Sequence, residues 1–334
     1  MITIVKNKKR LFFIILAIVL VLLPLAGFGV FVVTPAGAGK NVRLFDFGEG
    51  SSLKKLAGEL ERAGIISSAR MFVFYARLRG ADARVKAGSY QFSDGLSPAE
   101  ILRRMVAGEI FAARFAVPEG YSTYQIAELL ESRGIFKKEP FLKQCVNREL
   151  LKELGISGTS VEGYLYPSTY TIPPNMDEAG LVRMMVEQFD KVYGQRFAER
   201  VKALGVSRSM VVTVASMIEK EAVVPTERPL IASVFRNRLK RGMPLQSDPT
   251  AIYGIRAFGG KVSKQDIMRR TPYNTYLIKG LPPGPIGNPG KDAIEAAITP
   301  AASDYLYFVA RKDGTHYFSA TLEEHNRAVR RYLR

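Results

Sequence analysis

The segment Val211-Val-Thr-Val-Ala-Ser-Met-Ile-Glu-Lys-Glu-Ala222 has the apolar spacing of one helical face. Successive helix residues lie about 100° apart around the axis. Ser207 is the predicted N-cap, and the helix is expected to run to about Val224, before Pro225. We expect one apolar arc of this helix to be buried in a core; it comprises Val211, Val214, Ala215, Ile218 and Ala222.

Two carboxylates flank that arc. Glu221 lies between the directions of Met217 and Val214, and Glu219 lies on the other flank. A carboxyl group among apolar side chains loses hydration, which raises its pKa. The negative end of the helix dipole also disfavours an anion in the last turn. Both effects favour a protonated Glu221 that can act as a general acid. The alternative is that both glutamates are surface carboxylates paired with Lys or Arg.

The chain around this segment is predicted to be helical, with polar and aromatic loops between the helices. Further helices are expected over 140–155, 177–205 and 229–240. Loops on a helical scaffold are where binding grooves form. Three loops are rich in Gly, Pro, Tyr and polar residues, and they cover 161–174, 243–254 and 271–290.

A short sequence element recurs in the first half of the chain, at residues 50–65 and 120–135. Each copy has a predicted serine N-cap and an apolar helical stripe, and it ends at a glycine where the helix stops. The N-caps are Ser52 and Ser122, and the glycines are Gly64 and Gly134.

A looser third copy follows Gly88. It has a strand over 89–92, a turn at Asp94-Gly95 and a helix opened by Ser97-Pro98. A strand, a capped helix and a second strand are typical of small carbohydrate-binding modules. Residues 45–112 resemble the LysM-type module, which binds N-acetylated glycans. A plain spacer domain is the alternative.

Residues 11–33 contain no charge over 23 positions. That length spans a hydrocarbon core of about 30 Å. Lysines and an arginine crowd positions 6–10, whereas the next cation downstream is Lys40. By the positive-inside rule the N-terminus is cytoplasmic and the rest lies outside. The alternative, a signal peptide cleaved near Ala36-Gly37-Ala38, would have a shorter apolar region.

The composition narrows the classes of partner and cofactor. A formal net charge of +17 suggests an anionic neighbour such as a phospholipid surface or an acidic wall polymer. No nucleic-acid-binding module is recognisable, so we expect no nucleic acid partner. The single Cys145 excludes an internal disulfide, and two histidines are too few for an imidazole-based metal site. We therefore expect no metal and no organic cofactor.

Seven ordered segments carry a more specific signal. They resemble the endolytic murein transglycosylases of the YceG-like family, and the resemblance covers essentially the whole chain. The segments are Val161-Glu-Gly-Tyr-Leu-Tyr-Pro-Ser-Thr-Tyr170, Ala215–Ala222, Val234-Phe-Arg-Asn-Arg-Leu239, Pro244-Leu-Gln-Ser-Asp-Pro-Thr250, Pro272-Tyr-Asn-Thr-Tyr276, Gly280-Leu-Pro-Pro-Gly-Pro285 and Tyr305-Leu-Tyr-Phe-Val309.

The resemblance implies a peptidoglycan lytic transglycosylase. Such an enzyme cleaves the β-1,4 bond between N-acetylmuramic acid and N-acetylglucosamine and leaves 1,6-anhydro ends, here on nascent strands to terminate their elongation. Glu221 matches the catalytic acid/base, with Glu219 as the fallback. Gln246, Asn274 and Tyr276 match positions that line the saccharide groove. Arg238, Asp248 and Glu162 are further binding candidates that alternatively hold loops together through buried hydrogen bonds.

The predicted fold class is α+β, in five parts. They are a cytoplasmic tail (1–10), a transmembrane helix (11–33), a linker (34–44), a small LysM-like α/β module (45–112) and a larger mixed helical catalytic domain (113–334) with a loop-lined groove. The expected location is the cytoplasmic (inner) membrane, with a single pass and the catalytic domain outside. Peptidoglycan synthases are the protein partners that the resemblance implies.

A single acidic group is enough for this reaction, whereas glycosidases normally use two carboxylates. By resemblance, Glu221 protonates the bridging oxygen and then takes the proton of the muramic 6-hydroxyl as that oxygen closes on C1. Two other functions stay open: a non-catalytic glycan-binding scaffold of the wall-synthesis machinery, and an ordinary hydrolase that releases reducing muramic ends.

Overall fold

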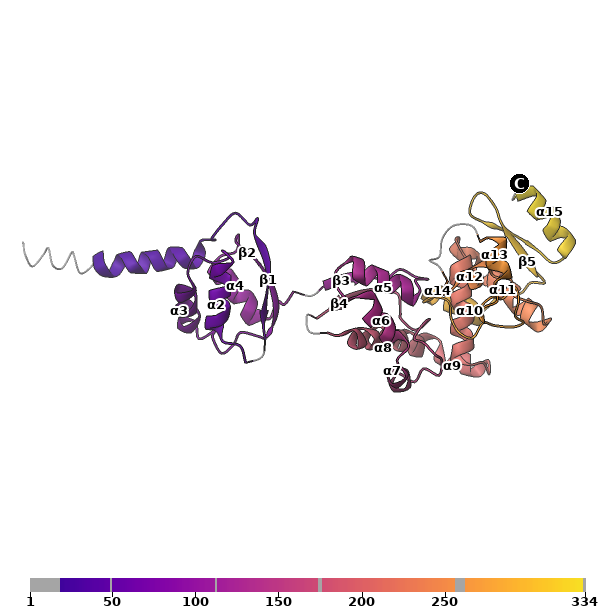
Figure 1. The fold of residues 1–334 in the computed structure, drawn as a ribbon, viewed down its shortest axis with the longest axis horizontal. Coiled ribbons are helices and arrows are strands. Elements are labelled where there is room, and N and C mark those ends of the chain that lie inside the picture. Colours follow the sequence, from indigo (N-terminus) through magenta and orange to yellow (C-terminus); the bar gives the residue numbers. More distant parts are fainter. Residues whose placement is uncertain (1–18, 49, 112, 174–175, 256–261, 333–334) are drawn as a thin grey trace, which may run out of the picture. The chain divides into compact units, whose positions relative to one another are not determined.

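The structure is a computed structural model that describes residues 19–48, 50–111, 113–173, 176–255 and 262–332. The chain folds into two compact units, and each is described by itself (Figure 1). The first unit is Met1–Ala113 with Ile172–Asn175, and the second is Arg114–Thr171 with Met176–Arg334. Helices and small antiparallel sheets occur together, which confirms the α+β class.

In the first unit, two helices separate two strands along the chain, and the two strands pair with each other. Its elements are β1 (Val42–Phe47), α2 (Leu53–Arg62), α3 (Ala69–Leu78), β2 (Gly88–Ser93) and α4 (Pro98–Ala107). The two strands are antiparallel, with Val42 opposite Ser93 and Phe47 opposite Gly88. Alternate strand residues and one stripe of each helix point inward. The resulting core includes Phe45, Leu56, Leu60, Phe72, Tyr90, Phe92 and Met105.

The predicted capped helices are present in both copies of the repeat. Ser52 caps α2, and Ser122 caps α5 (Thr123–Ser132). Gln125 returns a hydrogen bond from its side chain to the Ser122 backbone N–H at 3.0 Å, which completes a capping box. Each helix is followed by its predicted glycine in the left-handed region, since φ is 71° at Gly64 and 66° at Gly134. Positive φ is accessible to glycine at little steric cost.

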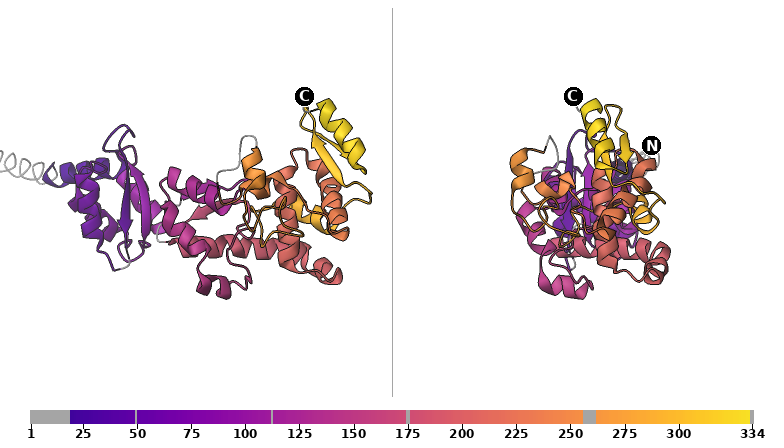
Figure 2. Two further views of the ribbon diagram at one scale, coloured as in Figure 1. Left: turned by 45° about the vertical axis from the view of Figure 1, so that its right-hand side comes forward. Right: turned by 90° about the vertical axis from the view of Figure 1, so that its right-hand side faces the viewer.

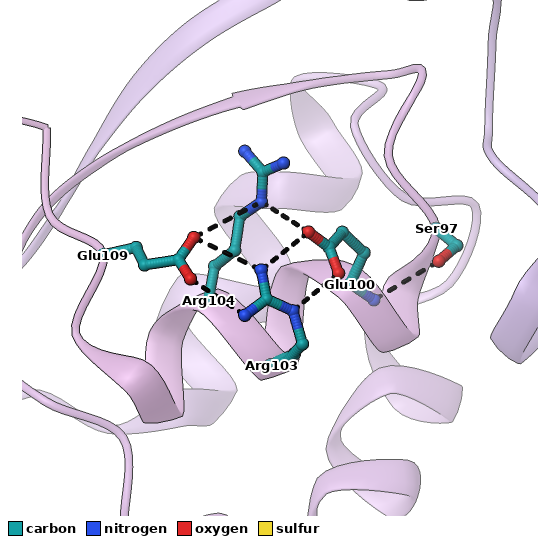
Figure 3. A network of polar contacts seen from close by, with 5 residues as sticks. All are labelled: Ser97, Glu100, Arg103, Arg104 and Glu109. Carbon is teal, nitrogen blue, oxygen red and sulfur yellow. Dashed lines mark hydrogen bonds and ion pairs between the residues drawn. The ribbon is translucent and has the colours of Figure 1, made fainter.

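An exposed ion network lies along α4 (Figure 3). Glu100 accepts hydrogen bonds from Arg103 and Arg104, each at 2.8 Å, and Arg103 also reaches Glu109 at 2.8 Å. The hydrogen bonds from Arg103 and Arg104 lower the pKa of Glu100 to about 2. The network therefore links the first turn of α4 to the residue that follows its C-terminal Gly108.

Residues 19–33 are helical, and the C-terminal end of this helix packs on the rest of the first unit. The ring of Phe28 lies 5.3 Å from that of Phe74 on α3, and Phe31 is buried in the core. Positions 11–18 of the predicted membrane helix lie outside the described residues. Within the described ranges, no helix is both long enough and apolar enough to cross a membrane.

The second unit is mainly helical. Its elements are β3 (Ala113–Ala116), α5, α6 (Lys138–Cys145), α7 (Arg148–Glu153), β4 (Thr169–Ile172), α8 (Glu178–Arg196), α9 (Ala198–Ala203), α10 (Arg208–Glu221), the 3₁₀-helix η1 (Pro225–Glu227), α11 (Arg228–Lys240), α12 (Asp248–Ile252), α13 (Lys264–Met268), α14 (Lys291–Ile298), β5 (Tyr307–Ala310), β6 (His316–Ser319) and α15 (Leu322–Tyr332). The strands β5 and β6 pair in antiparallel fashion and lie beside α15 (Figure 2).

Two predicted helices are each divided in the structure. The segment 140–155 breaks at Asn147, whose side chain accepts hydrogen bonds from the first backbone N–H groups of α7. The segment 177–205 breaks at Phe197, which has φ −123° and separates α8 from α9. Apolar spacing continues through both breaks, so periodicity alone could not show them.

Helix α10 is the central helix of the second unit, and it packs against α11, α12 and α14. Val211, Ala215 and Ile218 of the predicted arc are buried, whereas Val214 and Ala222 are only partly buried. The buried face extends instead to Val212 and Met217. The hydroxyl of Ser216 accepts a hydrogen bond from the backbone N–H of Ile286 at 3.0 Å. The helix ends at Glu221 because Ala222 is extended, with ψ 103°. Glu221 is therefore the last helical residue, and the helix ends before the predicted Val224.

Replacing the N-cap serine of α5 tests the local stability of the second unit. Ser122→Ala removes the acceptor for the N3 backbone N–H, and we expect a loss of about 1 kcal/mol in the free energy of unfolding. Ser132→Ala, at the exposed end of the same helix, is the matched control. Urea unfolding followed by circular dichroism measures both variants, and equal losses would contradict the capping role.

Candidate active site

The carboxyl group of Glu221 is held at the end of α10 by a buried hydroxyl. Its Oε1 accepts a hydrogen bond from Ser247 Oγ at 2.6 Å. Burial raises the pKa of Glu221 to about 7; the Ser247 hydrogen bond opposes this shift, and the charge of Asp248 adds to it. The residue as a whole is half-buried. Near neutral pH the group can therefore both donate and accept a proton.

The second carboxylate of the helix, Glu219, is fully engaged. Its side chain is only 6% exposed. One oxygen accepts from Arg228 Nη2 at 2.9 Å, and the other accepts from the backbone N–H of Gly290 at 2.9 Å. Arg228 begins α11, and Gly290 is the N-cap of α14. Glu219 thus joins three helices, whereas the hydrogen bond that holds Glu221 comes from a neutral hydroxyl.

A strained turn presents Ser247 to Glu221. Gln246 has φ 51°, and it is the only residue other than glycine with a positive φ in the described part of the chain. Thr275 holds the backbone of this turn: its carbonyl accepts from Gln246 N at 3.1 Å, and its hydroxyl accepts from Ser247 N at 3.0 Å. Backbone strain of this kind persists where the surroundings over-determine it, and it is concentrated at functional sites. The turn leaves Gln246 and Asp248 exposed.

Arg238 supports the same turn from inside the protein. It is buried, and it donates to the carbonyl oxygens of Leu306 at 2.6 Å and Leu245 at 3.0 Å, and to Gln246 Oε1 at 3.1 Å. Its guanidinium also lies over the ring of Tyr307, 5.1 Å from the centroid. Because these donors bind protein acceptors, Arg238 positions the turn at Gln246 from the interior of the protein.

Tyr276 and Asp248 form a pair beside Glu221. The Tyr276 hydroxyl donates to Asp248 Oδ1 at 2.5 Å. Burial raises the pKa of Tyr276, and the hydrogen bond to Asp248 and the charges of Asp248 and Glu221 raise it further. Asp248 also raises the pKa of Glu221. The three groups therefore lie within electrostatic range of one another, with Asp248 exposed and Tyr276 half-buried.

Asn274 lies inside the protein, away from any exposed surface. It is fully buried, and its amide donates to the carbonyl oxygens of Ile267 at 2.9 Å and Arg269 at 2.8 Å. Its Oδ1 accepts from the backbone N–H of Tyr276 at 3.1 Å. The structure therefore corrects the expectation of a groove-lining residue: the amide donors of Asn274 bind the segment 267–269, and its Oδ1 holds the backbone of Tyr276.

Glu162 is also internal. It is 2% exposed and accepts from Thr123 N at 3.0 Å, Tyr253 OH at 2.9 Å and Asn288 Nδ2 at 3.1 Å. Burial raises the pKa of Glu162 to about 7, and the hydrogen bonds from Thr123 and Tyr253 oppose the rise. A raised pKa alone therefore does not identify the acid, since Glu162 and Glu221 share it. Glu162 holds loops together, which is the alternative role expected for it.

The structure thus brings three of the predicted binding residues, Gln246, Asp248 and Tyr276, to the same place as Glu221. Two supporting residues, Ser247 and Thr275, were not predicted from the sequence, although both lie in the matching segments and directly beside predicted residues. In the described ranges, no three His, Cys, Asp or Glu side chains are grouped so that they could hold a metal ion.

Comparison with known proteins identifies the family of this chain. The YceG-like family matches residues 45–331. An endolytic murein transglycosylase of Bacillus subtilis (strain 168) is 34% identical over 300 residues, which cover 85% of this chain and 83% of that protein. An endolytic murein transglycosylase of Streptococcus pneumoniae serotype 2 is 33% identical over 317 residues, which cover 85% of this chain and 57% of that protein.

A solved structure gives the same result. The 2.6 Å crystal structure of a putative yceG-like protein from Listeria monocytogenes has a TM-score of 0.61 and 34% sequence identity, and it covers 86% of this chain and 99% of that chain. The resemblance found in the seven ordered segments is therefore confirmed, and the chain belongs to the YceG-like family.

Proposed function

We propose that this chain is a peptidoglycan lytic transglycosylase with Glu221 as its acid/base. One observation carries the proposal: a carboxyl group with a pKa of about 7 ends α10 beside the exposed Gln246 and Asp248. The relatives from B. subtilis and S. pneumoniae, both named endolytic murein transglycosylases, support the substrate class.

The reaction uses Glu221 twice. Protonated Glu221 gives its proton to the oxygen between N-acetylmuramic acid and N-acetylglucosamine, and the bond from that oxygen to muramic C1 breaks. The resulting carboxylate takes the proton of the muramic 6-hydroxyl as the hydroxyl oxygen bonds to C1. The product is a 1,6-anhydro end, Glu221 is protonated again, and no water is consumed. A pKa near the working pH suits both steps.

The neighbouring groups favour this sequence. Positive charge develops at C1 in the oxocarbenium-like transition state. Asp248 carries negative charge beside Glu221, and the Tyr276 hydroxyl fixes one of its oxygens. Preorganised charges of this kind stabilise a transition state without reorganisation. The exposed side chain of Gln246 offers its amide N–H groups to the carbonyl of an N-acetyl group, while Arg238 holds its Oε1.

The location and the first unit complete the proposal. Residues 11–33 anchor the chain in the cytoplasmic membrane with the N-terminus inside; the uncharged 23-residue stretch and the preceding lysines support this. In the first unit, the order β1, α2, α3, β2 with paired antiparallel strands supports a LysM-like glycan-binding role. An enzyme held there would cut nascent strands and end their elongation, next to the synthases that make them.

Exchange of the acid tests the proposal directly. Full-length protein is incubated with purified sacculi, and muropeptides are analysed by mass spectrometry. Wild type is expected to produce anhydro ends, and Glu221→Gln is expected to lower the rate by about 10²- to 10⁴-fold, because the proton donor is lost. Glu199→Gln, on the exposed part of α9, is the matched control and should behave as wild type.

The other outcomes of this experiment are equally informative. Equal anhydro yields from wild type and Glu221→Gln would remove Glu221 from its role. Reducing muramic ends would indicate a hydrolase. Strand binding without any cleavage by wild type would identify a glycan-binding scaffold.

The pH dependence of kcat/KM gives a second test. Because the acid form starts the reaction, kcat/KM should fall as pH rises through about 7, by about tenfold per pH unit well above it. The Ser247 hydroxyl stabilises the carboxylate and lowers the pKa of Glu221. Ser247→Ala should therefore move the alkaline limb to higher pH. A limb near the ordinary glutamate pKa, or a shift to lower pH in the variant, would contradict the assignment.

A further inference from the structure

A pocket of about 930 Å³ opens in the second unit beside α5 and α6. Its size falls within the range of ligand-binding pockets. Three tyrosines contribute to its wall, and the charged side chains of Glu139 and Lys143 lie on its α6 side. The tyrosines come from separate parts of the chain: Tyr124 is the second residue of α5, Tyr253 follows α12, and Tyr273 lies in the loop after α13.

The three tyrosine rings form one contiguous aromatic cluster in the pocket wall. The Tyr124 and Tyr253 rings meet edge to face with centroids 6.2 Å apart, and the Tyr253 and Tyr273 rings are 4.6 Å apart. Tyr253 cannot rotate freely, because its hydroxyl donates to the buried Glu162 at 2.9 Å. Tyr124 is 44% exposed, so its ring is accessible to a ligand.

Such a surface matches a sugar ring. A pyranose has apolar C–H faces, which can lie on an aromatic ring, and polar groups around its edge. Tyrosines offer an apolar face together with a hydroxyl. The pocket adds the hydroxyls of Thr159 and Ser160 and the charges of Glu139 and Lys143 for the polar edge. Fixed rings also cost little conformational entropy when a ligand binds.

Two chain segments connect this pocket to Glu221. The first is α12: Ser247, just before it, binds Glu221, and Tyr253, just after it, lies in the pocket. A helix of five residues is only roughly 8 Å long. The second is the loop in which Tyr273 precedes Tyr276 by three residues. The groups beside Glu221 and two of the pocket tyrosines are therefore held by the same two short segments of the chain.

We propose that the pocket of Tyr124, Tyr253 and Tyr273 is a second saccharide site, which holds N-acetylated sugar rings of the strand at a distance from the cleaved bond. The choice of ligand rests on the proposed function. Occupation of this site sets the position of the strand relative to Glu221. Oligosaccharides too short to span both places bind weakly for that reason.

The chain contains no tryptophan, which allows a selective test. Tyr124→Trp places the protein's single tryptophan in the pocket, where it can be excited selectively over the tyrosines, and the additional change Glu221→Gln keeps the ligand intact. Peptide-free glycan strands added to the full-length protein should shift the emission in a saturable way. Leu204→Trp in the same background, 53% exposed at the end of α9, is the matched control and should not respond.

The second arm measures affinity for the same strands in the Glu221→Gln background. Tyr124→Ala should raise the Kd by about two- to tenfold, which corresponds to the loss of one aromatic contact. Tyr124→Phe keeps the ring and should bind like the parent protein.

Four results would overturn the pocket assignment. They are no emission change while strands bind, an unchanged Kd for Tyr124→Ala, no strand binding by any variant, and a response that requires the stem peptide. Failure of the proposed function is a separate result, because it is read from the products of the wild-type enzyme. A wild type that forms no anhydro ends, together with a saturable response of Tyr124→Trp, would remove the activity and retain the saccharide site.

Discussion

The double pairing of Glu219 is the interaction on which the rest of the site depends. Both of its oxygens are occupied, one by Arg228 and one by the backbone of Gly290, so the end of α10 is fixed to α11 and α14. Residues two apart on a helix point in widely different directions. With Glu219 committed inward, Glu221 faces the turn at Ser247. One carboxylate thereby stabilises the fold, and its neighbour keeps a pKa suited to proton transfer.

The turn opposite Glu221 is held from two sides. Arg238 binds the side chain of Gln246, and Thr275 binds the backbone N–H groups of Gln246 and Ser247. The positive φ of Gln246 is tolerated because these contacts over-determine the turn. The strained backbone that presents Ser247 to Glu221 is therefore supported by two buried residues, Arg238 and Thr275.

Much of the local structure could be predicted from the sequence. Serine caps, glycine stops and the apolar arc of α10 act over a few residues, so their signals lie close together in the chain. Breaks at Asn147 and Phe197 were missed because the apolar spacing continues across them. The loss of hydration at Glu221, which raises its pKa, was also predictable, since the side chain lies on the flank of a buried helical face.

By itself, the sequence determined the family, the capped helices and the pair of candidate acids. Only the tertiary structure decided which glutamate receives the arginine, and that Asn274 and Glu162 turn inward. The tyrosine pocket likewise exists only in three dimensions, because its rings come from positions 124, 253 and 273. The physical reason is that helix periodicity and capping are local, whereas the partner of a buried polar group is chosen by contacts between distant segments.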